Sequence, residues 1–242
     1  MSDSTVLTKA YVEDILAGCP DRDADSEWHF EEFDAIDINA AEVLATLPGE
    51  LDLSGLTDIS DVIARVLSGR SGGLVLSGLK ILTDTSAEIL CLHNGELVLG
   101  GLTAFSDAIA EILSRHNGGL VLYGLTTLSD AAAESLSRSK GGLCLDGLET
   151  MSDSAAESLS RHNGNLYLNL LTNISDAAAL SLSKHRGELQ ICGLMSLSDF
   201  GAKQLSRHRG DLWLDGLTSL SDVAAETLSR HRGRLLLRGL TN

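Results

Sequence analysis

Leucine recurs at fixed positions along most of this chain, in a 23-residue unit that repeats eight times from Gly49 to Arg232. When each unit is numbered from its first residue, Leu or Ile occupies positions 3 and 5 in every copy. Alternation with a period of two over so short a run predicts a strand with one buried face. Glycine at position 7, replaced only once by Leu170, predicts a tight turn at the end of that strand.

The second half of each unit has the pattern of a short amphipathic helix. Positions 12 and 13 read Ser-Asp in seven copies and Thr83-Asp84 in the other, which supplies a hydroxyl N-cap and an acidic first-turn residue. Apolar residues at positions 11, 15, 16 and 19 follow at helical spacing and predict one buried stripe. The glycine that opens the next unit is expected to adopt the left-handed conformation that ends a helix.

Tandem units of strand, turn and helix predict a stacked solenoid with parallel strands. Strands stack at about 4.8 Å whereas helices pack at about 8–10 Å, so such a stack must curve with its strands inside. We therefore expect an α/β fold, a curved right-handed solenoid with a concave parallel sheet, a convex rim of short helices and an N-terminal helical cap.

The fifth copy shows the residue spacing most clearly. Its strand segment reads Leu143-Cys144-Leu145-Asp146-Gly147-Leu148, and its helix begins Met151-Ser152-Asp153-Ser154-Ala155 and continues to Leu159-Ser160. This spacing resembles that of the leucine-rich repeat family, in particular its cysteine-containing type with a shortened unit. Leu148 stands where that type has Cys or Asn. The resemblance covers residues 49–242 and implies protein–protein recognition through the concave face.

The segment before the regular units keeps part of their pattern. Residues 26–48 hold the register, with Trp28 and Phe30 at the strand positions, and are interpreted as a degenerate repeat. Residues 4–17 have the apolar spacing of a short amphipathic helix. We expect residues 1–25 to form a helical cap that shields the first repeat, with a partner-binding helix as the alternative. Cap and repeats together are expected to form a single solenoid domain.

Eight full units at 49–232 are followed by residues 233–242, which supply only the strand of a ninth copy. An apolar strand without a covering helix favours self-association. A truncated chain is one alternative, and an edge tolerated because of its arginines is another. The residues expected at this C-terminal edge are Arg234, Leu235, Leu236, Leu237, Arg238 and Leu240.

Positions 4 and 6 vary between copies and are expected to face solvent on the concave side. The position-4 column holds three valines, then Tyr and Trp, and is more apolar than a solvated sheet face requires. Aromatic residues anchor interfaces, but valine and aromatic side chains also favour strands and pack along their own column, so both interpretations stay open. The predicted binding residues are Val75, Val98, Val121, Tyr123, Tyr167 and Trp213.

A net charge of −16 argues against a nucleic-acid partner. Residues 1–48 hold 12 acidic and 2 basic residues, whereas nine basic and six acidic residues follow from Lys184 onward. This gradient would orient a partner.

The sequence shows neither a signal peptide nor an apolar run of membrane-spanning length, so we expect no membrane association. A cytoplasmic location is expected from the unpaired spacing of Cys19, Cys91, Cys144 and Cys192.

Few residues suggest an active site. Gly69-Arg70-Ser71-Gly72-Gly73 matches a hydrolase motif, but it stands between a helix and a strand rather than between a strand and a helix. Position 22 forms a histidine ladder, whose members would lie too far apart to share one metal if helices are about 8–10 Å apart. We expect no enzyme activity, no metal and no cofactor. The ladder comprises His93, His116, His162, His185, His208 and His231.

The sequence therefore predicts a non-enzymatic scaffold that binds a protein or peptide on its concave sheet. The alternative is a structural, self-assembling module, such as a homodimer formed through the C-terminal edge.

Overall fold

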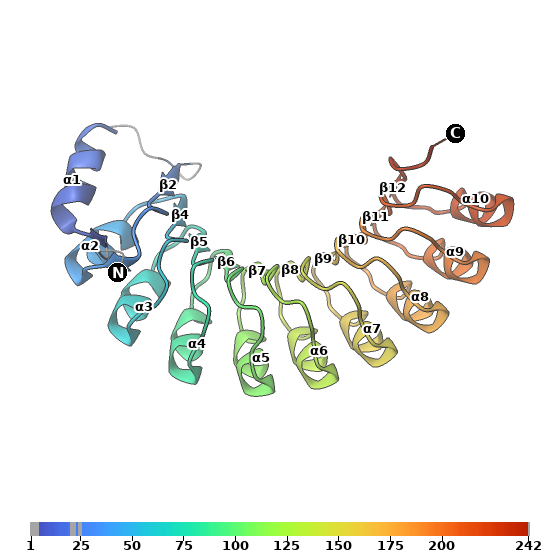
Figure 1. Ribbon diagram of the computed structural model, residues 1–242, viewed down its shortest axis with the longest axis horizontal. Helices are drawn as coiled ribbons and strands as arrows, with labels where there is room; N and C mark the ends of the chain where they lie inside the picture. Colours follow the sequence, from blue (N-terminus) through green and yellow to red (C-terminus); the bar gives the residue numbers. More distant parts are fainter. Residues whose placement is uncertain (1–4, 20–22, 24–25, 242) are drawn as a thin grey trace. The chain divides into compact units, whose positions relative to one another are not determined.

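Strands and helices alternate along the chain with the period of the sequence repeat, in a computed structural model that describes residues 5–19, 23 and 26–241. The chain divides into two units, residues 1–121 (unit 1) and 122–242 (unit 2). In both units parallel strands lie on one side and short helices on the other (Figure 1). The expected α/β repeat architecture is confirmed, while the single solenoid domain stays a prediction.

In unit 1, equivalent positions of successive copies pair with one another. Leu51 lies opposite Leu74, Leu74 opposite Leu97, and Leu97 opposite Leu120. Trp28 pairs with Leu51, so the degenerate repeat continues the same register. The strands, in their order within this sheet, are β2 (Glu27–His29), β4 (Glu50–Asp52), β5 (Leu74–Val75), β6 (Leu97–Val98) and β7 (Leu120–Val121).

The N-terminal segment differs from the predicted helix over residues 4–17. Val6–Leu7 forms strand β1, which pairs in parallel with β3 (Ala35–Ile36), and Asp37 donates its backbone N–H to the carbonyl of Leu7 at 3.0 Å. The buried side chain of Leu7 and this pairing outweigh the helical spacing. Residues 1–4, 20–22 and 24–25 of the expected cap lie outside the described residues. The helices of unit 1 are α1 (Lys9–Ala17), α2 (Ile38–Ala45), α3 (Asp61–Ser68), α4 (Asp84–Leu90) and α5 (Asp107–Leu113).

Unit 2 repeats the same arrangement with greater regularity, and its helices fan out on the side opposite the strands (Figure 1). Its strands, again parallel and one repeat apart in register, are β8 (Leu143–Cys144), β9 (Leu166–Tyr167), β10 (Leu189–Gln190), β11 (Leu212–Trp213) and β12 (Leu235–Leu236). Its helices are α6 (Asp130–Leu136), α7 (Asp153–Leu159), α8 (Asp176–Leu182), α9 (Asp199–Leu205) and α10 (Asp222–Leu228).

Leucines fill the space between strands and helices. In the sixth copy, Leu166, Leu168, Leu171 and Leu182 have no exposed surface. A helix of seven residues, the length of α8, is too short to be stable alone. Burial of each leucine contributes about 1.5–3 kcal/mol relative to exposure, so packing of this stripe holds the helices in place.

The glycines that open the units are needed for a reason other than the expected one. Only Gly49 among the described glycines has a positive φ, of 82°. At Gly95 and Gly118, a Cβ atom would instead collide with the carbonyl oxygen of the corresponding glycine one repeat earlier. The left-handed helix stop is therefore wrong for the later copies, where glycine allows the loop backbones to stack closely.

Candidate functional site

The predicted binding residues of unit 1 lie on the strand face, the side of its sheet opposite the helices. Val75 and Val121 are half-buried, and Val98 is only 9% exposed. These valines lie opposite one another in adjacent strands, so each covers its neighbours. In unit 1 this column therefore offers a partner a small apolar area.

The strand face of unit 2 carries all of that unit's Tyr and Trp residues. Tyr123 is 46% exposed, while Tyr167 and Trp213 are half-buried. The Tyr167 hydroxyl accepts a hydrogen bond from Asn165 Nδ2 at 3.2 Å. The guanidinium of Arg238 lies over the Trp213 ring, 5.5 Å from its centroid, which is a cation–π arrangement.

Polar side chains form a connected network on the same face. Asn169 Nδ2 donates to Asp146 Oδ2 and to Gln190 Oε1, each at 3.2 Å, and Gln190 Nε2 donates to Glu188 Oε1 at 2.6 Å. Hydrogen bonds between side chains at positions 4 and 6 of three successive copies thus fix the orientations of these side chains. This network was not predicted from the sequence, although amide and acidic side chains at positions 4 and 6 of neighbouring copies are complementary. The face combines aromatic surface with oriented polar groups, which suits recognition of a peptide or protein.

The position-22 histidines are stacked, and all are buried except His231, which is half-buried. In unit 2 the ring centroids of His162, His185, His208 and His231 are 6.2, 5.9 and 6.1 Å apart in turn. This spacing is tighter than the helix spacing assumed from the sequence, because the rings lie in the loops between helix and strand. His231 Nε2 contacts the carbonyl oxygen of Gly210, the residue that opens the same copy, at 3.1 Å. The stacked rings therefore join neighbouring copies.

Unit 1 has a shorter stack of the same kind. The rings of His93 and His116 are 6.2 Å apart, and His116 Nε2 lies 3.1 Å from the Gly95 carbonyl oxygen. Burial lowers the pKa of His93 and His116 in this unit, as it lowers the pKa of His162 and His208 in unit 2. These rings are therefore neutral and structural near neutral pH.

Within the described ranges, one group of side chains has the geometry to share a metal ion. Ligand atoms of His29, Glu31 and Asp52 all lie within 4.8 Å of one another. His29 and Glu31 are exposed, and Asp52 Oδ1 already accepts a hydrogen bond from the backbone N–H of Ser54 at 2.8 Å. Sequence spacing could not have shown this group, because β2 and β4 bring its members together.

The hydrolase-like motif has a structural explanation. Arg70 occupies position 22, is 2% exposed, and donates to the carbonyl oxygens of Gly49, at 3.0 Å, and Gly73. Ser71 is exposed in the following loop.

Burial raises the pKa of the Cys91 and Cys192 thiols, which disfavours a nucleophilic role for either at neutral pH.

The predicted C-terminal edge combines half-buried leucines with exposed cations. Leu235, Leu236 and Leu237 are half-buried, and Leu240 is 40% exposed. Arg234 and Arg238 each donate a backbone N–H to an aspartate of the preceding copy, Asp211 and Asp215, at 2.9 Å.

None of the described helices has the length and apolar character needed to cross a membrane.

Comparison with protein-family models gives no match, and comparison with curated protein sequences gives none either. An internalin of Listeria monocytogenes has a similar solved structure, with 18% identity, a TM-score of 0.47 and coverage of 82% of this chain. A leucine-rich repeat protein of Leptospira interrogans matches with 18% identity, a TM-score of 0.48 and the same coverage. This chain spans 64% and 50% of the length of those two chains. These structural neighbours are leucine-rich repeat proteins, and the described residues contain the regular 23-residue strand–helix unit that the sequence repeat predicts.

Proposed function

We propose that this chain is a non-enzymatic scaffold that binds a protein or peptide partner through its strand faces. The observation that carries the proposal is the placement of aromatic residues in unit 2. Tyr123, Tyr167 and Trp213 all stand on the strand face, while the core of that unit is built of Leu, Ala and Ile. Large aromatic side chains are the commonest anchors of protein interfaces.

The polar network next to these aromatics supports the same role. Asn169, Asp146 and Gln190 hold one another in fixed orientations, so their remaining hydrogen-bonding groups are preorganised for a partner. The valines of unit 1 would contribute a secondary apolar contact. A cytoplasmic location is part of this proposal.

A capture experiment tests the proposal. The immobilised chain is exposed to a lysate of its source cells, and captured proteins are quantified by mass spectrometry. A variant with Tyr123→Ser, Tyr167→Ser and Trp213→Ser should retain specific partners at least about tenfold less, because interface aromatics each contribute about 2 kcal/mol or more.

The matched control removes exposed apolar groups from the helix side of the same unit. Phe200 in α9 is 46% exposed, as Tyr123 is, and Val223 in α10 is 55% exposed. A Phe200→Ser, Val223→Ser variant should capture the same partners as the wild type. Equal capture by the aromatic variant would refute the proposed binding face.

Self-association through the C-terminal edge is the second candidate. Half-buried Leu235 and Leu237 and exposed Leu240 there form an apolar surface that a second copy would cover. Light scattering at rising concentration tests this candidate. A constant monomer mass would exclude it, and a dimer that is lost in Leu240→Ser would support it.

A further inference from the structure

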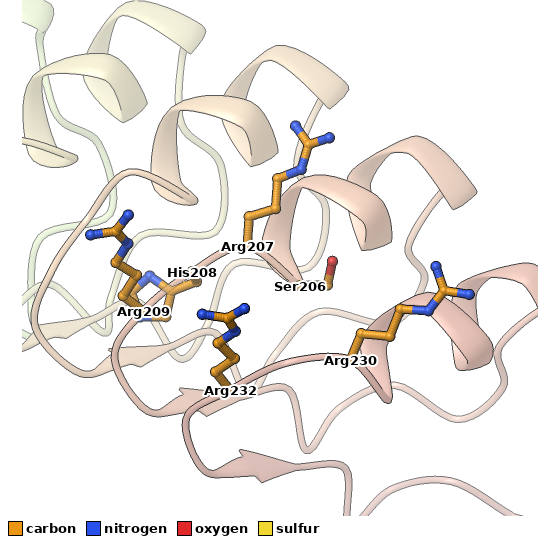
Figure 2. Close-up of a pocket in the computed structure, with 6 residues that line it drawn as sticks. All are labelled: Ser206, Arg207, His208, Arg209, Arg230 and Arg232. Atoms are coloured by element: carbon orange, nitrogen blue, oxygen red, sulfur yellow. The ribbon is translucent and has the colours of Figure 1, made fainter.

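The loops that follow the helices of unit 2 carry a dense group of cations on one edge, separate from the strand face. In copies six to eight, two basic residues flank each histidine of the ladder, as Arg207 and Arg209 flank His208. All six cations are exposed, and Figure 2 shows four of them extending from the ends of α9 and α10 and the loops that follow. We call this surface the basic edge, formed by Lys184, Arg186, Arg207, Arg209, Arg230 and Arg232.

The helix dipole explains only half of these cations. Residues at position 21, such as Arg207 and Arg230, follow the last helical turn and favour its negative end. Arg186, Arg209 and Arg232 stand two residues later, where the second, third and fifth copies have asparagine. The neighbouring histidine stack needs no charge at that position, since it forms in unit 1 beside Asn94 and Asn117.

Most cations of the basic edge have no partner among the described residues. Arg207 donates to Gln204 Oε1 at 3.0 Å, and Arg230 pairs with Glu226 at 2.6 Å. The structure gives the side chains of the other four, Lys184, Arg186, Arg209 and Arg232, no ion pair or hydrogen bond to any described residue.

The acidic residues at the strand starts of copies seven and eight are already engaged elsewhere. Glu188 accepts from Gln190, and Asp211 accepts from the backbone N–H of Arg234. Six like charges on one edge, of which only Arg230 has an ion-pair partner among the described residues, repel one another. An anionic ligand would relieve this repulsion.

Three hollows lie along the basic edge, and the one of about 320 Å³ is lined by Glu157 and Arg161 as well as Lys184 and Arg186. The other two are lined mainly by cations. The larger, of about 720 Å³, is lined by Ser206, His208 and the four arginines of copies seven and eight (Figure 2). The smaller, of about 210 Å³, lies beside Lys184 and Arg186 and shares Arg207 and Arg209 with the first. Because two arginines line both of these hollows, the two hollows lie next to each other across three copies.

The spacing of the copies sets the spacing of the cation pairs. The histidine rings between them are 5.9 Å apart from His185 to His208 and 6.1 Å from His208 to His231. In an extended peptide, successive side chains on one face are about 6.4–6.8 Å apart. The mismatch of about half an ångström per step is small enough for flexible arginine side chains to absorb.

We propose that the basic edge binds an extended acidic segment of a protein partner, with Asp or Glu at every second residue. Each carboxylate would lie between the two cations of one copy, and successive carboxylates would meet successive copies. This surface differs from the strand face that carries the proposed function, so the two sites can be tested separately.

A peptide suits this edge better than a nucleic acid does. Residues 1–121 hold 21 acidic and 6 basic residues, and the whole chain has a net charge of −16, which repels a long polyanion. None of the three hollows is lined by Tyr, Trp or Phe, on which the bases of a single strand would stack. A short acidic segment brings few charges and needs no stacking platform.

Fluorescence anisotropy tests the proposal with labelled synthetic peptides and the full chain. One octapeptide alternates Glu and Ser, and a second has the same composition with its four glutamates in one block. The variant Arg186→Asn, Arg209→Asn, Arg232→Asn places at position 23 the residue found there in other copies, so the fold is expected to persist. It should weaken binding of the alternating peptide about tenfold, since each exposed ion pair contributes modestly.

The matched control removes three cations of unit 1, by Arg65→Asn, Lys80→Asn and Arg115→Asn, and makes the same change in net charge. It should bind the alternating peptide like the wild type, as should the Tyr123→Ser, Tyr167→Ser, Trp213→Ser variant. Equal weakening by both charge variants, or equal affinity for both peptides, would overturn the proposal in favour of non-specific attraction.

Two further outcomes would also overturn it. Tighter binding of a single-stranded oligonucleotide with the same number of charges would assign the edge to nucleic acid. A concentration-dependent dimer in light scattering that the alternating peptide dissociates would make the occupant a second copy of this chain, whose sequence has acids at Asp21, Asp23, Asp25 and Glu27.

Discussion

Arg70 holds the place in its copy that histidine holds in six others, and it is equally buried. Its guanidinium contacts the carbonyl oxygen of Gly49 at 3.0 Å, much as His116 contacts that of Gly95 at 3.1 Å. Burial lowers the pKa of Arg70 to about 10, and the charge of Glu50 opposes this shift. The side chain is therefore a buried cation held mainly by carbonyl groups, which accept its hydrogens without carrying a full charge.

The first prediction concerns this position. Arg70→Ala should lower the free energy of unfolding by about 2–4 kcal/mol, because it leaves a cavity and removes the side-chain donor from the buried Gly49 carbonyl. Arg70→His should lower the free energy of unfolding by less than half of that amount. A ring nitrogen at this position can donate to the carbonyl oxygen of Gly49, as the equivalent histidines do in other copies. Urea denaturation followed by circular dichroism measures both values.

Exposed Arg65 in α3 provides the control, since its change to Ala should alter stability by no more than about 0.5 kcal/mol. If Arg70→His were as unstable as Arg70→Ala, arginine and histidine would not be equivalent at position 22.

Each helix of unit 2 beyond the first begins with a serine that serves two elements. Ser175 accepts a hydrogen bond from the backbone N–H of Ala178 at 2.9 Å, which caps α8. The same hydroxyl donates to Asp153, the first residue of α7. Ser152, Ser198 and Ser221 repeat this pattern, so the caps form a ladder of Ser–Asp hydrogen bonds. Short helices that could not stand alone are thus tied to one another at their N-termini.

The second prediction tests this double role. Ser175→Ala should lower the free energy of unfolding by about 1–3 kcal/mol, because it removes both the cap and a hydrogen bond to a carboxylate. Ser183→Ala is the matched control, since that hydroxyl donates only to the Leu180 carbonyl within its own turn, at 2.8 Å. Its effect should stay within about 0.5 kcal/mol in the same chemical denaturation. Equal losses in the two variants would show that the contact with Asp153 adds nothing.

Elements whose signals are local were predictable from the sequence. The alternation of apolar positions predicted the strands, and the Ser-Asp pairs predicted the helix starts. Each of these features depends only on residues within a few positions of one another. Burial of the histidines was not predicted, since it depends on how closely the loops of adjacent copies approach. The strand at Val6–Leu7 was missed for a similar reason, because its partner, Ala35–Ile36, lies far away in the sequence. At the candidate site, the outward face was predictable, but Arg238 over Trp213 and the Asn169 network needed contacts between copies.

For the molecule as a whole, the histidine stacks make stability depend on pH. Burial, together with the charges of His208 and His162, lowers the pKa of His185 to about 4. A histidine in the unfolded chain titrates near 6.5, so below that pH the unfolded state binds the proton more readily. The stabilisation from a neutral ring is thus complete above pH 6.5 and is lost as pH falls toward 4. Acidification also reduces the repulsion that accompanies a net charge of −16, which acts in the opposite direction.

The third prediction separates these two effects with a variant of one ring. Between pH 7.5 and 5.5, the wild type should lose about 1.3 kcal/mol more unfolding free energy than His185→Gln, because glutamine does not titrate. Urea denaturation of both proteins at the two pH values gives this double difference, in which the general charge effect cancels. Exposed Asn173, which does not titrate, is the control, and Asn173→Gln should show the wild-type loss. A double difference near zero for His185→Gln would mean that the folded protein protonates this ring as easily as the unfolded chain does, and the ladder would then have no part in acid sensitivity.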